Sequence, residues 1–232
     1  MCIRDSDRKR KLEVYGPEGI REFIEAINKT VQFTLTFPVE VSEIKRSGII
    51  CKENEYEVLA VEADHVIPSF AFALVEKPRP GKFYPEEAKK LGIPEGPLWS
   101  KLQKGQSVKL PNGRIVEPSQ VVGPPRPGRK IVYSGDSRPC RSIVKLAENA
   151  DLLIHDSTLD DELAEKAYED GHSTPSQAAE TAKKAKVKML VLTHVSARYK
   201  TTDKLLQQAK KIFPNVAVAE DFMKIDIPLK KS

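Results

Sequence analysis

Cysteine, histidine and long apolar runs are all scarce in this chain of 232 residues. The cysteines at positions 2, 51 and 140 include no Cys-x-x-Cys pair, which argues against a thiolate metal site and for a reducing compartment. No apolar run approaches the ~20 residues that span a bilayer, and no signal-peptide pattern opens the chain. The composition therefore predicts a cytoplasmic protein without a membrane partner.

The net charge of +5 is modest, but it is distributed unevenly. Residues 76–130 carry twelve basic and five acidic side chains, a net +7, which leaves −2 for the rest. They also hold ten of the seventeen prolines and seven of the twelve glycines, too many for a long helix or a packed strand. Loops longer than about 15 residues are usually functional. We expect a protruding arm that contacts a polyanion; an ordinary solvated surface segment is the alternative.

Strand and helix patterns alternate on both sides of this arm. Strands are expected at residues 12–15, 31–37, 48–51, 56–62, 130–134, 152–155, 188–193 and 215–219. Helices are expected at residues 18–28, 85–91, 98–104, 141–148, 176–185 and 202–213, with a hairpin turning at residues 111–113. The pattern predicts an α/β layered core. It comprises residues 12–75 and 131–232, interrupted by the arm at 76–130 and preceded by a disordered or non-native leader at 1–11.

The four histidines, His65, His155, His172 and His194, all lie where a strand ends or a loop begins. Asp136 also follows a predicted strand. Catalytic groups of α/β folds gather at the carboxyl ends of strands. One such histidine is more often structural than a ligand, but four placements without a stray histidine favour a site. Imidazole with carboxylate suits hydrolysis by Zn²⁺ or Mn²⁺, and a carboxylate shared by two ions would help to generate a hydroxide near neutral pH.

Several short segments resemble, in order, the motifs of the ribonuclease Z family, metallo-β-lactamase-fold endonucleases that trim tRNA precursor 3′ ends. The segments are 63–69 (ADHVIPS), 91–98 (LGIPEGPL), 133–139 (YSGDSRP), 154–158 (IHDST), 171–174 (GHST) and 192–199 (LTHVSARY). The likeness runs from Leu12 to Pro228. It implies an α/β fold, an incomplete metallo-β-lactamase αββα sandwich with a protruding arm.

The resemblance also implies roles for single residues. His65 would ligate one zinc ion, His194 the second, and Asp136 both, with Mn²⁺ as an alternative metal. His172 would be a catalytic histidine oriented by Asp156, which stands where the family usually has glutamate and is short enough to require a different approach or a water bridge. The implied substrate-binding residues are Ser196 and Arg198 for phosphate, and Gly96, Pro97, Lys89, Lys90, Lys101 and Lys104 for tRNA.

The family's leading His-x-His-x-Asp-His cluster is missing, since His65 is the first histidine. Two protein ligands per ion are fewer than the three usual for catalytic zinc. We therefore expect a truncated chain that is inactive alone. The resemblance further suggests a homodimer acting on tRNA precursors. The alternatives are a non-catalytic tRNA-binding module and another metallo-β-lactamase-fold hydrolase that acts on small esters.

Overall fold

The computed structural model describes residues 9–31 and 36–230. The chain divides into two compact units. The first unit contains the residues up to Val75 and Lys130–Ile225, and the second contains Glu76–Arg129 and the residues from Asp226 onward. The predicted leader lies largely outside the described residues. In the described ranges, no helix combines the length and the apolar character that crossing a membrane requires.

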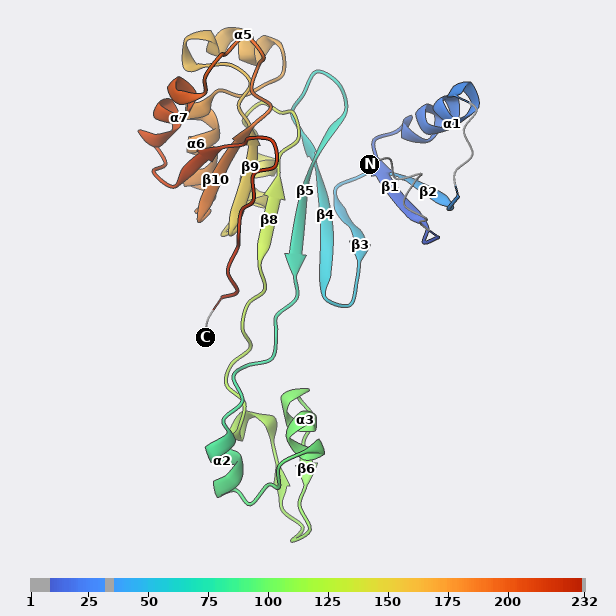
Figure 1. Ribbon diagram of the computed structural model, residues 1–232, viewed down its shortest axis with the longest axis vertical. Coiled ribbons are helices and arrows are strands. Elements are labelled where there is room, and N and C mark those ends of the chain that lie inside the picture. The colour runs from blue at the N-terminus through green and yellow to red at the C-terminus, as the bar shows by residue number, and fades with distance from the viewer. Residues whose placement is uncertain (1–8, 32–35, 231–232) are drawn as a thin grey trace. The chain divides into compact units, whose positions relative to one another are not determined.

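A seven-stranded mixed sheet forms the centre of the first unit (Figure 1). Its order is β11 (Val216–Val218), β10 (Met189–Thr193), β9 (Leu152–Asp156), β8 (Lys130–Tyr133), β5 (Ser69–Glu76), β4 (Tyr56–Ala63) and β3 (Gly48–Lys52). Strands β8 to β11 are parallel, and β5 runs antiparallel to β8. The carboxyl ends of β8, β9 and β10 therefore lie at one edge together with the loop that enters β5.

Helices pack against one face of this sheet. They are α4 (Arg141–Leu146), α6 (Pro175–Lys184) and α7 (Asp203–Lys210), whose buried residues share one core with the sheet. A further short helix, α5 (Ala164–Glu169), precedes α6. Cross-strand partners Ala73 and Val132 are fully buried beneath them, whereas the next residues along the strands, Leu74 and Tyr133, are exposed. The seven-stranded sheet thus has one helical layer on one face, which is half of an αββα sandwich.

Helix α6 begins one residue before the predicted range, at a capped end. Thr174 accepts a hydrogen bond from the Gln177 backbone, and the Gln177 side chain accepts one from the Thr174 backbone. Pro175 occupies the first helical position, where its missing N–H costs nothing. This capping fixes the end of the preceding loop, which carries His172.

The N-terminal segment differs from the expectation at one strand. It consists of β1 (Leu12–Gly16), α1 (Ile20–Val31) and β2 (Val39–Glu43), and the two strands are parallel. The prediction of a strand at 31–37 is wrong for the residues that the structure describes, because Val31 ends α1 and the strand β2 begins only at Val39. Residues 32–35 lie outside the described residues. The helical apolar spacing continues to Val31, which overrides its preference for a strand.

The second unit has an apolar core of its own. Its elements are α2 (Pro85–Lys90), α3 (Pro97–Gln103), the hairpin of β6 (Val108–Lys109) and β7 (Ile115–Val116), and a 3₁₀ turn at Pro118–Gln120. Ala88, Leu102, Val116 and Val121 are fully buried. The proline- and glycine-rich segment is therefore a small folded body, which its composition alone did not indicate.

Candidate active site

The sheet edge brings together the residues that the sequence singled out. Asp136 follows β8, Asp156 ends β9 and His194 follows β10. The ring centroid of His172 lies 5.1 Å from that of His65 and 4.9 Å from that of His194. Nε2 of His194 lies 3.6 Å from Oδ2 of Asp136. His194 adopts a left-handed φ of 59°, a strained conformation for a residue with a side chain, which is characteristic of functional sites.

Asp156 is the buried centre of a hydrogen-bond network. Its Oδ2 accepts hydrogen bonds from Nδ1 of His172 at 2.7 Å and from the Ser137 backbone N–H at 3.0 Å. Its Oδ1 accepts a hydrogen bond from the Thr158 hydroxyl at 2.7 Å. The water bridge considered for this short side chain is not required, because the end of β9 places the carboxylate directly against the imidazole.

The rings of the other two histidines of the site also form hydrogen bonds through Nδ1. Nδ1 of His65 donates to the Gly171 carbonyl at 2.8 Å, and Nδ1 of His194 lies 2.7 Å from the Thr158 hydroxyl oxygen. Together with His172, all three rings have Nδ1 bonded to oxygen, which leaves Nε2 available. Metal-ligating histidines typically show this pattern, in which the other ring nitrogen is held by an oxygen.

Two positions for a cation can be compared in this donor set. Ligand atoms of Asp156, His172 and His194 lie within 4.8 Å of one another. However, both oxygens of Asp156 already accept hydrogen bonds, and it is the Nδ1 atoms of the two histidines that lie toward it. The carboxylate of Asp136 is more open, with 39% of its side chain exposed, and it lies on the Nε2 side of His194. The geometry therefore fits a cation beside Asp136, with Asp156 as the orienting carboxylate.

The site also has residues that the sequence analysis missed. Arg138 donates to the Asp64 carboxylate at 2.9 Å and to the Tyr168 carbonyl at 2.6 Å, and so connects the loops that carry His65 and His172. Gly171 has a φ of 86°, and a Cβ atom built there would lie 2.4 Å from Nδ1 of His65. Arg138 and Gly171 both lie inside segments that resemble the family's motifs, and this position in the sequence could have indicated that they belong to the site.

The local electrostatics are consistent with a cation site. Burial raises the pKa of Tyr133, and the negative charges of Asp136 and Asp156 raise it further. A cation beside Asp136 would offset this negative charge. The residues present, imidazoles and carboxylates without thiolates, thus fit a divalent metal.

Comparisons with known proteins identify the family. A family model described as "Beta-lactamase superfamily domain" matches residues 111–195, which include Asp136, Asp156 and His172. Ribonuclease Z of Methanosarcina acetivorans is 48% identical over 224 residues, which cover 96% of this chain and 73% of that protein. The chain belongs to the ribonuclease Z family.

Solved structures give the same assignment. The short form of human tRNase Z is 30% identical, with a TM-score of 0.64, and the match covers 96% of this chain and 70% of that one. The metallo-β-lactamase fold protein YhfI from Bacillus subtilis is 17% identical, with a TM-score of 0.58 over 94% of this chain and 66% of that one, and shows the fold alone. The predicted family and the metallo-β-lactamase fold are confirmed.

In this ribonuclease Z family member, the loop after β10 places Ser196 and Arg198 together. The Ser196 hydroxyl accepts a hydrogen bond from Nε of Arg198 at 3.2 Å, and its backbone N–H donates to the Thr158 carbonyl. His155 lies apart from this chemistry. Its ring is fully buried, burial lowers its pKa, and its Nδ1 donates to the Asp156 carbonyl. These contacts support a structural role for His155.

The predicted RNA-binding residues of the second unit are all exposed, but they differ in their partners. Lys90 pairs with Glu87 at 2.7 Å, and Lys89 lies within 4 Å of two glutamates. Lys101 and Lys104, on and just after α3, form no ion pair with any described residue. Gly96 has a φ of 124°, which favours glycine, and Pro97 follows as the first residue of α3. The Gly-Pro pair therefore sets the start of the helix that presents Lys101.

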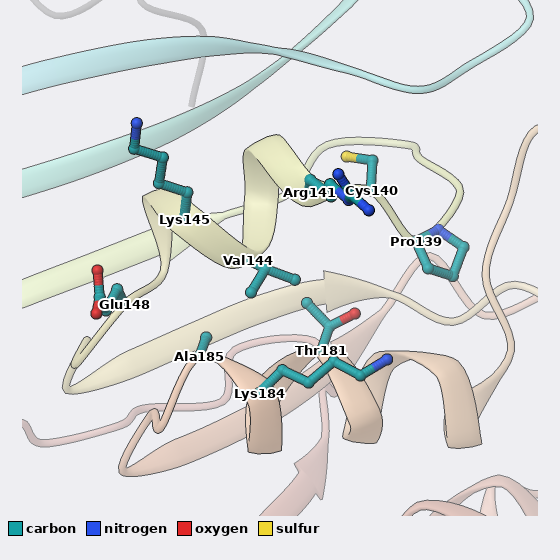
Figure 2. Close-up of a pocket in the computed structure, with 9 residues that line it drawn as sticks. All are labelled: Pro139, Cys140, Arg141, Val144, Lys145, Glu148, Thr181, Lys184 and Ala185. Carbon is teal, nitrogen blue, oxygen red and sulfur yellow. The ribbon is translucent and has the colours of Figure 1, made fainter.

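A pocket of about 520 Å³ between α4 and α6 is a separate feature (Figure 2). Val144, Thr181 and Ala185 line it, with the charged side chains of Lys145, Glu148 and Lys184 around them. None of the predicted site residues lines this pocket, so the chemistry described above does not use it.

Proposed function

We propose that this protein is a zinc-dependent endonuclease that removes the 3′ trailer from tRNA precursors. The observation that carries the proposal is the group of three imidazoles held through Nδ1, of which His194 lies beside the open carboxylate of Asp136. Relatives named ribonuclease Z, at 48% and 45% identity, support the substrate class.

His65, Asp136 and His194 would hold the metal, with Asp136 shared between two ions. Bound zinc would supply a hydroxide near neutral pH and positive charge for the phosphate in the transition state. Nitrogen and oxygen donors without thiolates suit zinc and also accept manganese. The side chains beside Asp136 are open enough for a phosphodiester, since 45% of the His194 side chain is exposed.

His172 would act as the general acid. Asp156 holds its Nδ1 proton and stabilises the positive charge of the doubly protonated ring. Nε2 then gives a proton to the oxygen that leaves phosphorus as the P–O bond breaks. Ser196 and Arg198, which are hydrogen-bonded to each other next to His194, would bind the phosphate.

The second unit would bind the tRNA body. Its net charge of +7 and the unpaired lysines on and beside α3 provide contacts for phosphates, independent of sequence. A hydrolase of small esters would gain nothing from this charge. A non-catalytic tRNA-binding module would not need His65, Asp136 and His194, and these three residues are present. Both alternatives are therefore less well supported than the endonuclease.

The central experiment compares the chain alone with the same chain joined, at its N-terminus, to the part of the Methanosarcina acetivorans relative that the match does not cover. We expect the chain alone to bind precursor tRNA without cleaving it, because two protein ligands per zinc hold the ion weakly. The joined protein should cleave at the 3′ end in the presence of zinc, and His194→Ala should abolish this. Cleavage that survives His194→Ala, or a joined protein that is inactive with zinc and manganese, would contradict the proposal.

We also propose, from the family resemblance, a cytoplasmic homodimer in which the second unit of one subunit holds tRNA for the site of the other. A mixture of two joined variants tests this arrangement. One variant carries His194→Ala and the other carries Lys101→Glu with Lys104→Glu. Mixed dimers should recover part of the cleavage that each variant lacks, whereas a monomeric enzyme should recover none.

A further inference from the structure

Thr158 connects the two halves of the candidate site. Its hydroxyl oxygen lies 2.7 Å from Oδ1 of Asp156 and 2.7 Å from Nδ1 of His194. A hydroxyl has one proton to donate, and an ionised carboxylate can only accept. The proton therefore points to Asp156, and the oxygen must accept a hydrogen bond from His194. The network assigns the proton of the neutral His194 ring to Nδ1.

We infer that Thr158 is a positioning residue that sets the tautomer of His194, so that one buried carboxylate orders the protons of two imidazoles. Asp156 holds Nδ1–H of His172 directly and Nδ1–H of His194 through Thr158. Nε2 of His194 is then unprotonated on the side of Asp136, 3.6 Å from its Oδ2. The inference rests on the proposed function only in taking His194 as a metal ligand.

The surroundings hold this arrangement in place. Asp156 is fully buried, and its backbone N–H donates to the Ser134 hydroxyl. The Thr158 backbone N–H donates to the Ser173 carbonyl, and the Thr158 carbonyl accepts from the Ser196 backbone. Both the carboxylate and the hydroxyl are thereby fixed by backbone bonds. By contrast, no other described residue forms a hydrogen bond with the His194 ring, so the hydroxyl is its main orienting contact.

Three variants separate the hydroxyl from the shape of the side chain. Thr158→Val keeps the volume and removes the hydroxyl, and Thr158→Ser keeps the hydroxyl. Thr181→Val is the control for the same chemical change away from the site, because the buried Thr181 hydroxyl donates to the Gln177 carbonyl within α6. All three are compared with the unsubstituted 232-residue chain.

Long-range nitrogen–proton NMR of the ring nitrogens reports the tautomer in the metal-free chain, above the ordinary imidazole pKa of about 6.5. We expect His194 to carry its proton on Nδ1 in the unsubstituted chain, in Thr158→Ser and in Thr181→Val, and to populate the Nε2–H form in Thr158→Val. An Nε2–H ring in the unsubstituted chain, or an unchanged ring in Thr158→Val, overturns the inference. If Thr158→Val does not fold, the unsubstituted chain and Thr158→Ser decide it.

Zinc affinity, measured by competition with a chromogenic chelator, reports the consequence. Loss of a group that orients a metal-binding histidine typically weakens affinity by about 10- to 100-fold, and we expect this for Thr158→Val but not for Thr158→Ser. Equal affinity of Thr158→Val and the unsubstituted chain would contradict the inference. Neither readout involves RNA, so a failure of tRNA cleavage with the expected tautomers would reject the proposed function and leave this inference standing.

Discussion

The candidate site and the second unit use charged residues in opposite ways. At the site, Asp156 is fully buried and each of its oxygens has a specific donor. In the second unit, pairs such as Lys90 and Glu87 are exposed neighbours on one helix. Exposed pairs contribute about 0–1 kcal/mol and are screened by salt. Under the proposed function, the site would therefore depend on geometry, whereas RNA binding by the second unit would depend on summed charge.

The largest expected effect comes from a substitution that changes one atom at the site. Asp136→Asn in the joined protein keeps the shape but removes the negative charge of the carboxylate proposed to bind both ions. Metal stabilisation of the transition state is worth several kcal/mol, so cleavage should fall on the order of 10³-fold. Affinity for precursor tRNA, measured by gel shift, should stay within about twofold if the second unit supplies the phosphate contacts, as proposed. If tRNA affinity fell together with cleavage, catalysis at the site and tRNA binding by the second unit would not depend on separate residues.

Substitutions in the second unit should show the opposite pattern. Lys101→Glu with Lys104→Glu should lower tRNA affinity roughly tenfold. The slope of log affinity against log salt concentration should become shallower by about 0.9 for each lost phosphate contact. Hydrolysis of a small phosphodiester by the joined protein should be unchanged. The matched control is Lys89→Glu with Lys90→Glu, whose glutamate partners already offset part of their charge. Equal losses from both pairs would mean that ion pairing does not decide which lysines bind RNA.

Much of the site could be predicted from the sequence because parallel strands place their carboxyl ends at a common edge. Asp136, Asp156 and His194 each follow or end one of three adjacent parallel strands. His65 could be included through its histidine-containing segment, although β5, the strand after its loop, was not predicted. That strand, SFAFALVE, alternates alanine with larger apolar residues, and alanine is depleted in strands.

The contacts that orient the site could not be predicted in this way. Thr158 bridges Asp156 and His194 across two strands, and Arg138 joins loops far apart in the sequence. Such contacts depend on side-chain direction and loop closure, which periodicity does not encode. The core of the second unit was missed for a related reason: Leu102, Val116 and Val121 are spread among prolines and glycines without a regular period.

Gly171 at the site and Gly92 in the second unit allow backbone strain to be compared between the two regions. Gly171 and Gly92 have φ values of 86° and 72°, so alanine costs about 1 kcal/mol at either position. Only at Gly171 would the added Cβ collide with a neighbour, Nδ1 of His65, since nothing lies within 4 Å at Gly92. Gly171→Ala should therefore also lower zinc affinity by roughly tenfold, measured by chelator competition, while Gly92→Ala should not. Equal zinc affinities would show that His65 is free to move.

The smallest expected effect concerns acid stability of the second unit. A bidentate pair with the Arg129 guanidinium lowers the pKa of Glu76 from 4.5 to about 2. Because the pKa is lower in the folded state, the stabilisation is present above pH 4.5 and is lost as the pH falls toward 2. Glu76→Gln should cost about 1 kcal/mol at neutral pH and little at the acidic end. Hydrogen exchange of residues 76–129 across this range measures it; a cost independent of pH would mean that the pair is not the cause.

The position of bound zinc tests the account most directly. Anomalous X-ray scattering at the zinc edge, from crystals of the joined protein, locates each ion without reference to activity. We predict zinc bound to Nε2 of His65 and His194 with Asp136 between the ions, and Asp156 hydrogen-bonded to Nδ1 of His172 without contact to metal. Zinc bound to Asp156 and to Nδ1 of His172 or His194 would contradict the account.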